Sequence, residues 1–457
     1  MGSESEFKAR AWEAALSPWH GHPPGLLVLF LTELWERFSF YGMGALLVLY
    51  LNSGPLMPGR FETLYGSSVI AALFGEPQDA DAVQALSSQL WGAYVCFAYV
   101  TPVVGGALAD SLLGSRATLL YGGVLMALGH ACMVWERCFL LGLALVALGN
   151  GGFKPSVSSQ VRSTSGHSLA VCVNPFDLCL CSLLCCVRCF ITHPPITTHP
   201  ISYVYIYMCV CVSILSSPLL QVSDLYPEHS PFRERGFAIF YSGINLGALL
   251  APILCGGLAS RSSYHAAFGL AGVGMLIGLG TYLLGWRYLP PPRAGAYLRR
   301  DTKPALCGAA GGAGGAAPMG FRRWASLLLL CLLTVPFWAV YAQLGNTLVL
   351  FLRDHTQRAP WPGGAPIPVA WLQSLNPCLC LFALPPLSAH WARRAARRAE
   401  PAPTRKMALG CTLLAAAYAL LGIAAAAAGS APTHPRDKLP LPSTVRRSWR
   451  RYVPIAE

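Results

Sequence analysis

The sequence has few charged residues. Asp, Glu, Lys and Arg make up only 12% of its 457 residues, about half of the fraction in an average soluble domain. Hydrophobic residues make up 54% and the mean hydropathy is +0.48, so a soluble monomer is excluded. Windows of about 20 mostly apolar residues, the length of a helix that crosses ~30 Å of hydrocarbon, recur along the chain. The composition therefore predicts an all-α integral membrane protein.

Acidic residues are fewer than basic residues, 20 against 33, and the formal net charge is +13. The basic residues cluster in alternate loops, as in cytoplasmic loops of membrane proteins, so they indicate a cytoplasmic N-terminus and not a nucleic-acid partner. Eight of the 17 cysteines lie between Cys172 and Cys211 without zinc-like spacing to histidines. We expect no metal, no cofactor and no disulfide framework. The polar first 22 residues also predict no cleavable signal.

Nine apolar spans are predicted from the hydrophobic windows. They cover residues 24–51, 88–109, 117–135, 138–159, 237–258, 266–289, 325–352, 369–390 and 407–428. The expected organisation is a cytoplasmic N-terminus (1–23), spans one to four (24–160), spans five and six (222–289), a Pro- and Gly-rich cytoplasmic linker (290–324) and spans seven to nine (325–428). The linker would separate a six-span first half from a second half.

Two segments depart from this pattern. Residues 161–221 join Cys-rich, His-Pro-rich and Tyr/Ile/Val-rich pieces without a helical or strand period. They are interpreted as a retained intron, since both flanks can be written by splice-site codons, or as a real insertion with one or two membrane segments near 169–191 and 201–220. Residues 429–457 are polar and basic, and they would lie on the far side of the membrane after nine spans, against the charge bias. We expect this tail to be foreign to the fold.

The first predicted span carries charges within the bilayer. Glu33, Glu36 and Arg37 stand at i, i+3 and i+4, on one face of a helix. An unpaired charge near the bilayer centre costs a few kcal/mol or more, so the three should pair and face a water-filled interior. One acid and one base would equally suit a structural salt bridge. The second acid leaves a spare carboxylate that can bind and release a proton, which favours a solute carrier over an enzyme.

Lys154 is a second cation for this acid. It follows the glycines of the run 149–155, Gly-Asn-Gly-Gly-Phe-Lys-Pro, which allow close packing of the fourth span. Two interpretations stay open: the ammonium meets the buried carboxylate, or it extends to the membrane surface.

Three motifs in order carry a family resemblance. Glu-x-x-Glu-Arg-Phe begins at Glu33, Gly-Asn-Gly-x-x-Lys-Pro at Gly149 and Phe-Tyr-Ser-Gly-Ile-Asn at Phe240. Together they resemble the proton-coupled oligopeptide transporters of the major facilitator superfamily, and residues 22–25, 99–110 and 371–377 are similar to its bacterial-type branch. The resemblance extends from about residue 20 to residue 428, apart from the insert. It implies a major facilitator fold with an incomplete, three-span second bundle.

The resemblance also implies roles for individual residues. Proton coupling would fall to Glu33, Glu36, Arg37 and Lys154, whose ammonium would also meet the peptide carboxylate. The implied substrate-binding residues are Tyr41, Tyr94, Lys154, Asn245, Trp338 and Asn376. Taken singly, Tyr94, Trp338 and Asn376 would more often pack or join helices. Asp110 and Arg116 would form a conformational latch between spans two and three.

The implied function is proton-coupled symport of di- and tripeptides by alternating access. The partners would be small peptides, protons and the lipid bilayer, with a monomer in the plasma membrane or an endomembrane. The sequence departs from the family at Gly44, where an Arg is usual, at Ala342, where a Glu is usual, and at Ser156, where an Asn is common; three further spans are also absent. Two alternatives therefore stay open: a non-transporting remnant, and a carrier of another small anion such as nitrate.

Overall fold

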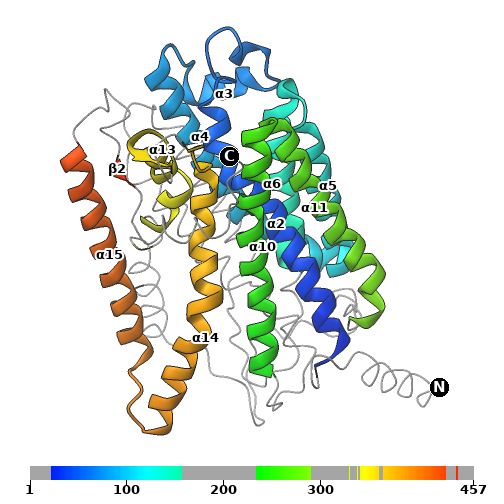
Figure 1. The fold of residues 1–457 in the computed structure, drawn as a ribbon. Helices are drawn as coiled ribbons and strands as arrows, with labels where there is room; N and C mark the ends of the chain where they lie inside the picture. Colours follow the sequence, from blue (N-terminus) through cyan, green and yellow to red (C-terminus); the bar gives the residue numbers. More distant parts are fainter. Residues whose placement is uncertain are drawn as a thin grey trace, which may run out of the picture.

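A computed structural model describes residues 22–156, 233–289, 329, 337, 340–359, 364–428 and 439–440. Within these ranges the chain is helical except for one pair of two-residue strands. The long helices are α2 (Pro24–Leu51), α4 (Ala80–Leu108), α5 (Gly114–Cys132), α6 (Phe139–Ser156), α10 (Arg233–Arg261), α11 (Tyr264–Gly285), α14 (Leu375–Ala396) and α15 (Pro403–Ala428). Figure 1 shows them as a set of roughly aligned rods. The expectation of an all-α chain is confirmed.

The remaining elements are short. They are the α-helices α3 (Ser67–Phe74) and α13 (Thr347–His355), the π-helical turn η3 (Ala109–Leu113), the 3-10 turns η2 (Phe61–Thr63), η4 (Glu136–Cys138), η6 (Trp286–Tyr288), η7 (Gln343–Gly345) and η8 (Val369–Ser374), and the strands β1 (Thr356–Gln357) and β2 (Leu439–Pro440). The two strands pair in parallel, with Thr356 opposite Leu439.

Several helix bounds differ from the apolar windows. Helix α4 begins at Ala80, ahead of the window at 88–109, because the Asp79 carboxylate accepts a hydrogen bond from the Ala82 amide at 2.8 Å and caps the helix. Helix α3 was not expected. The span expected at 325–352 is described chiefly at its end, where η7 interrupts it before α13. The insert at 161–221 and the linker at 290–324 lie outside the described residues, as does the tail at 429–457 except for β2.

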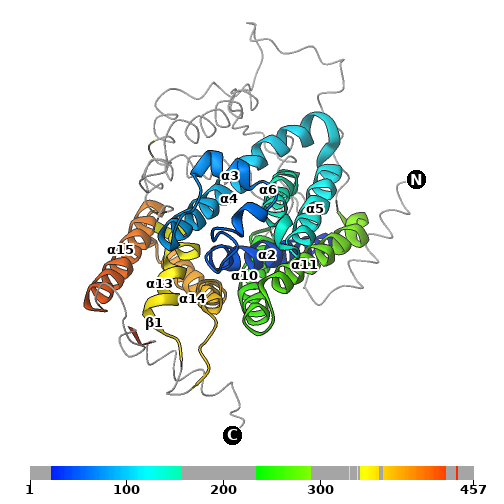
Figure 2. The same cartoon turned by 90° about the horizontal axis from the view of Figure 1, so that it is seen from above.

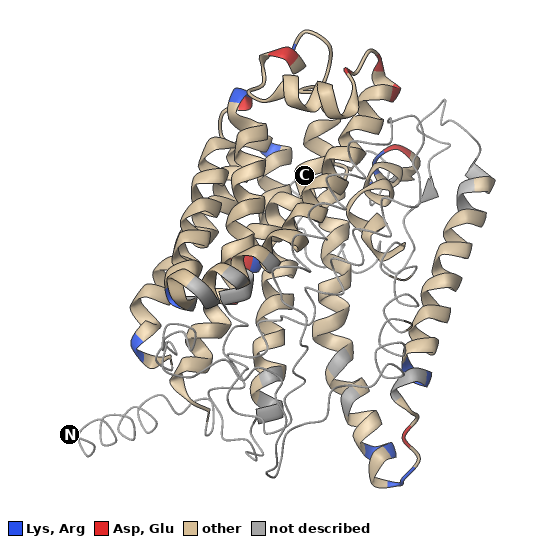
Figure 3. Cartoon of the chain, turned by 180° about the vertical axis from the view of Figure 1, so that it is seen from behind, with Lys and Arg blue, Asp and Glu red and all other residues tan. Residues whose placement is uncertain are grey.

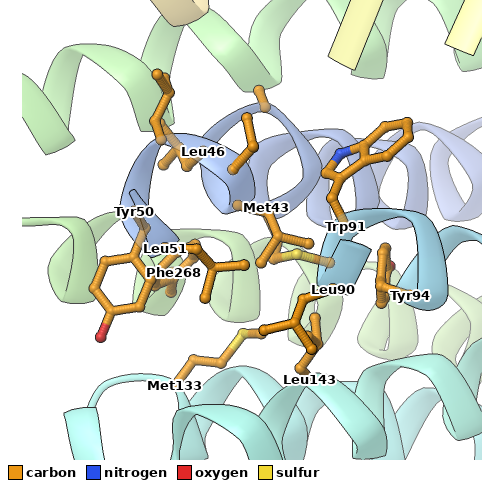
Figure 4. Packing of buried hydrophobic residues seen from close by; sticks show 14 of the residues in the cluster. Met43, Leu46, Tyr50, Leu51, Leu90, Trp91, Tyr94, Met133, Leu143 and Phe268 are labelled. Atoms are coloured by element: carbon orange, nitrogen blue, oxygen red, sulfur yellow. The ribbon is translucent and has the colours of Figure 1, made fainter. Parts of the chain in front are cut away.

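Six of the described helices pack into one bundle, in which α2 lies between α10 and α11 while α5 and α6 pack side by side. Figure 2 shows this arrangement from above. The bundle's apolar core gathers at the C-terminal part of α2, where Met43, Leu46 and Leu51 are fully buried. Figure 4 shows this core, with Met133, the residue after α5, and Phe268 of α11 closing around it. Because protein cores are close-packed, these buried side chains fix the position of α2 relative to the helices around it.

Glycines set the spacing between α5 and α6. A Cβ on Gly129 would lie 2.7 Å from the carbonyl oxygen of Gly142, and a Cβ on Gly142 would lie 2.6 Å from that of Gly129. About two helical turns along the same interface, a Cβ on Gly149 would lie 2.5 Å from the carbonyl oxygen of Gly122. These backbones approach more closely than any side chain permits, as is typical of small-residue interfaces between membrane helices.

The later helices form a separate group. Element η8 and the first part of α14 pack against α10, whereas α15 lies at the edge of the molecule beyond α14 (Figure 1). By length and composition, four of the described helices are apolar enough to cross a membrane: Glu136–Phe153, Ala238–Arg261, Tyr264–Tyr288 and Arg405–Ile423. In the last of these no residue is buried within the protein. Its apolar surface therefore suits a lipid environment.

Candidate functional site

The charged cluster of α2 is buried and paired. Nε of Arg37 donates to Oε1 of Glu33 at 2.9 Å and lies 2.5 Å from Oε2 of Glu36. Residue exposure is 4%, 0% and 8% for Glu33, Glu36 and Arg37. The helical spacing thus places two carboxylates on one guanidinium, as expected from the sequence. Two carboxylates thus share one guanidinium in a region from which water is largely excluded, where like charges repel strongly.

The guanidinium of Arg37 can donate further hydrogen bonds. Its hydrogen bond and ion pairs use Nε, and its carbon atom lies 5.5 Å from the centroid of the Phe40 ring. Within the described part of the chain, the two terminal nitrogens make no hydrogen bond. An arginine fork with free terminal N–H groups is suited to a carboxylate or another planar anion.

Tyrosines from four segments surround this cluster. The phenol groups of Tyr41 (α2) and Tyr99 (α4) lie within the range of electrostatic interaction with Arg37. Tyr341 lies in such range of both Tyr41 and Tyr99, and Tyr241 of α10 interacts in the same way with Tyr41 and Tyr341. Helices far apart in sequence therefore direct hydroxyl groups to one polar region beside the buried charges.

Four of the expected pocket residues have described side chains. Tyr41 is 38% exposed, whereas Tyr94 is buried against Phe40, and its hydroxyl has no hydrogen-bond partner among the described residues. Nδ2 of Asn376 donates to the Tyr341 hydroxyl at 2.7 Å. Asn245 is buried and donates to the carbonyl of Tyr241 in its own helix at 3.0 Å. The structure thus brings Tyr41 and Asn376 to one region through Tyr341.

Two expected residues are not fully described. Trp338 lies outside the described residues. Lys154 lies in α6, but its side chain is outside the description, so its pairing with the glutamates stays a prediction. The motif around it is anchored: Nδ2 of Asn150 donates to the Ala98 carbonyl of α4 at 2.7 Å, and a Cβ on Gly151 would lie 2.5 Å from Cβ of Thr101. These contacts fix α6 against α4 one turn before Lys154.

The expected latch is described on one side only. Asp110 lies in η3 and its side chain is outside the description. Arg116 donates to the carbonyls of Trp286 and Leu289 at 3.5 and 3.3 Å, and its guanidinium lies 5.6 Å from the Trp286 ring centroid. Arg116 therefore binds the end of α11, where a cation is favoured by the helix dipole.

Two of the departures from the family pattern, Gly44 and Ala342, have different surroundings. A Cβ on Gly44 would meet nothing within 4 Å, so the position is open on the same side of α2 as Tyr41. Ala342 is partly buried and packs against the hydrophobic core of the bundle. The missing side chain at 44 leaves space beside the polar region.

Sequence reasoning missed three residues of this region. Tyr99, Tyr241 and Tyr341 are not among the site residues expected from the sequence, although Tyr241 is 45% exposed. Spacing gives a signal only for Tyr241, which stands four residues before Asn245 on one helical face. Tyr99 and Tyr341 meet through tertiary packing, for which no local pattern exists.

The two helix groups are joined at one end of the polar region. Nε1 of Trp371 donates to the Ile253 carbonyl at 2.9 Å and Oγ of Ser374 to the Leu249 carbonyl at 2.8 Å. Nε2 of Gln373 donates to the carbonyl of α2 residue Ala45 at 3.0 Å. At the opposite end of α14, most described side chains between Phe382 and Glu400 are exposed.

Nη1 of Arg353 adds a contact at the joined end, 2.5 Å from Oδ1 of Asn52. Buried paired charges, convergent hydroxyl groups and apolar helices that are closed together at one end define a helical membrane transporter.

Comparison with known proteins gives the family. A family model described as the POT family matches residues 178–302 and 317–444, more than half of the chain. The chain belongs to the POT family. The match includes part of the segment at 161–221 and part of the tail at 429–457; the division of the chain into domains stays a prediction.

Bacterial relatives are similar at moderate identity. The "Uncharacterized transporter YclF" of Bacillus subtilis is 32% identical over 58% of this chain, and the "Di-/tripeptide transporter" of Lactococcus lactis subsp. cremoris is 31% identical over the same share. The chain spans only 38% of the length of each. The "Peptide transporter YePEPT" of Yersinia enterocolitica is 25% identical over 89% of this chain and 74% of its own length.

Solved structures agree in fold. A peptide transporter POT crystallised with alafosfalin has a TM-score of 0.57 at 22% identity, covering 94% of this chain and 80% of that one. A POT family transporter with a thioalcohol-conjugated peptide has a TM-score of 0.57 at 20% identity, with the same coverage. At such identities the likeness supports the major-facilitator-like fold alone.

Proposed function

We propose that this chain is a proton-coupled symporter of di- and tripeptides that works by alternating access. The observation that carries the proposal is the placement of Glu33 and Glu36 on the single guanidinium of Arg37 within a buried helix. The names of relatives from Yersinia enterocolitica and Lactococcus lactis, both peptide transporters, support the substrate class.

Proton coupling would follow from competition for Arg37. When a peptide carboxylate approaches the terminal nitrogens of Arg37, which make no hydrogen bond to the described residues, less of the positive charge would be available to the glutamates, and one glutamate would gain a proton. When the peptide leaves, the proton is released. Lys154 would provide the second cation in this exchange. Substrate and proton are thereby linked by electrostatics, without a covalent step.

Peptide binding would use the polar groups around Arg37. Tyr41, Tyr94, Asn245, Trp338 and Asn376 would contact the peptide backbone and termini. A carrier of many peptides must bind these shared groups and leave room for variable side chains. The open space at Gly44 provides room of this kind.

Alternating access would use the joined end of the helix groups. The hydrogen bonds from Trp371 and Ser374 to α10 close the end at which α2 terminates, while the lower part of α14 stays exposed. Asp110 and Arg116 would stabilise one arrangement of the bundle. Breaking one set of contacts and forming another at the opposite end would move the site's opening across the membrane.

The membrane arrangement is part of the proposal. The N-terminus would be cytoplasmic, with six spans before residues 290–324 and three after them, in a monomer of the plasma membrane or an endomembrane. Residues 161–221 would be a retained intron or an insertion, and 429–457 a tail foreign to the fold.

Uptake into proteoliposomes tests the function. We expect the purified chain to accumulate a labelled dipeptide when an inward proton gradient is imposed, and unlabelled tripeptide to compete. Glu36→Gln and Lys154→Ala should abolish gradient-driven accumulation, whereas Glu136→Gln, an acid in the loop ahead of α6, should retain it. Absence of uptake by a correctly inserted, monodisperse protein would identify a non-transporting remnant. Competition by nitrate and not by dipeptides would identify a carrier of another anion.

A further inference from the structure

The turn between α14 and α15 concentrates positive charge. Residues 391–406 contain five arginines and Lys406 but a single acid, Glu400. Nearly all of the described side chains in this turn are exposed. Figure 3 shows the basic groups at the foot of these helices, at the end where α2 and α10 begin. The turn therefore presents a basic surface at one boundary of the membrane-spanning region.

Part of this charge is engaged within the turn. Nε of Arg393 donates to the Ala389 carbonyl at 3.2 Å, and Nε of Arg394 to the Ala399 carbonyl at 3.0 Å. Lys406 forms an ion pair with Glu400, and its ammonium lies 4.8 Å from the ring centroid of Trp391. These contacts order the turn and neutralise its one acid.

Three arginines of the turn take no part in these contacts. Arg397, Arg398 and Arg405 are exposed, and in the described part of the chain their side chains make no hydrogen bond or ion pair. Arg398 holds its place with a positive φ of 53°, stabilised by a hydrogen bond from its amide to the Ala395 carbonyl at 2.9 Å. An ordered turn thus presents three unpartnered guanidinium groups together.

The neighbouring Trp391 marks the depth of these groups. Tryptophan is enriched at the level of lipid headgroups, and here it lies between the apolar part of α14 and the arginines. The arginines then stand at or just beyond the lipid phosphates. Guanidinium binds phosphate through paired N–H donors, and each basic residue near an anionic bilayer surface adds to the attraction.

We propose that this basic turn binds the phosphate headgroups of anionic phospholipids in the leaflet that surrounds it, through Arg397, Arg398 and Arg405. The occupant is a lipid and not a soluble anion, because the three groups flank an interfacial tryptophan and an apolar helix in which no residue from Arg405 to Ile423 is buried within the protein. Acyl chains of the bound lipid would lie along α14 and α15. The site is independent of the proposed transport activity.

Spin-labelled lipids test this site in the intact chain reconstituted in phosphatidylcholine. We expect the motionally restricted signal to favour spin-labelled phosphatidylglycerol over spin-labelled phosphatidylcholine at least about threefold, less so at high salt. The triple change Arg397→Gln, Arg398→Gln, Arg405→Gln should abolish most of this preference. The matched triple change Arg446→Gln, Arg447→Gln, Arg450→Gln removes the same charge elsewhere and should retain it.

Several results would overturn the proposal. They are no preference in the unmodified chain, an unchanged preference in the first triple variant, or an equal loss in the matched control. Displacement of the labelled lipid by millimolar inorganic phosphate at constant ionic strength would indicate a soluble-anion site instead. If the triple variant fails to insert, the single change Arg405→Gln should lower the preference in part, and the three Arg→Lys changes should retain it; the opposite results exclude the site.

Discussion

The indole Nε1 of Trp371 donates a hydrogen bond of 2.9 Å to the carbonyl oxygen of Ile253, and this contact joins η8 to the bundle helix α10. A Cβ on the adjacent Gly256 would lie 2.7 Å from Cβ of Ala370, so the two elements approach without space between them. The closed end of the molecule therefore depends on side-chain donors meeting main-chain carbonyls. Such contacts form and break without loss of helix structure.

Trp371→Phe should weaken the closed end, because it keeps an aromatic ring and removes the donor. A hydrogen bond of this kind is worth about 0.5–1.5 kcal/mol, enough to raise the separated population by up to about tenfold. Amide hydrogen exchange of the segment 364–375 should accelerate. Trp135→Phe, at a tryptophan that is 63% exposed, is the control. Equal exchange in all three proteins would contradict a gating role for this bond.

The buried pair Ser39 and His130 should support stability. Oγ of Ser39 lies 2.7 Å from Nε2 of His130, both residues are fully buried, and Nδ1 of His130 has no partner among the described residues. Ser39→Ala should cost about 1–3 kcal/mol in the free energy of unfolding, because it leaves the imidazole without partners.

Thermal unfolding in detergent measures this effect. Adding His130→Leu to Ser39→Ala should recover part of the loss, since no buried polar group is then left unsatisfied. Ser260→Ala, at an exposed serine, should have no effect. A double variant less stable than the single one would refute the explanation.

Gly247→Ala should separate α10 from α2. A Cβ at this position would lie 2.3 Å from the Leu34 carbonyl oxygen, and backbone cannot move aside as a flexible side chain does. We expect a loss of about 1–3 kcal/mol or more. Gly44→Ala is the matched control: it meets nothing within 4 Å and lies in the same helix as Leu34. Similar melting temperatures for the two variants would show that this close approach is not required.

Arg37→Met should destabilise the protein more than Glu33→Gln does. Loss of Arg37 leaves two buried carboxylates without this cation, at a cost of about 3–5 kcal/mol, whereas Glu33→Gln leaves Arg37 paired with Glu36. Protein yield and thermal unfolding at neutral pH compare the two. An Arg37→Met protein as stable as Glu33→Gln would mean that Arg37 is not the principal counterion.

The surface ion pair of Arg60 and Glu136 should contribute little to the stability of the protein. Nη2 of Arg60 lies 2.6 Å from Oε2 of Glu136, and the hydrogen bond with this carboxylate raises the pKa of the arginine. The Arg60 side chain is 55% exposed, so water screens the pair. Glu136→Gln should change stability by less than about 1 kcal/mol, and less still in high salt. A larger loss in urea unfolding would contradict this.

Much of the fold was accessible from local pattern. Helix α2 has the bounds 24–51 expected from its apolar window, and the pairing of Glu33, Glu36 and Arg37 follows from the helical period. The early start of α4 was missed because the apolar window does not register a polar first turn, although Asp79 is a recognisable cap. Helix α3, a surface element of eight residues, carries no comparable signal.

The sequence by itself determined the class of protein, its helical character and the charged cluster of α2, because hydropathy and helical period are properties of short segments. Only the tertiary structure decided that Tyr99, Tyr241 and Tyr341 meet beside Arg37, and that Trp371 closes one end against α10. Those contacts join segments that are far apart in the sequence. Their partners are chosen by close packing of whole helices, and no local spacing encodes that choice.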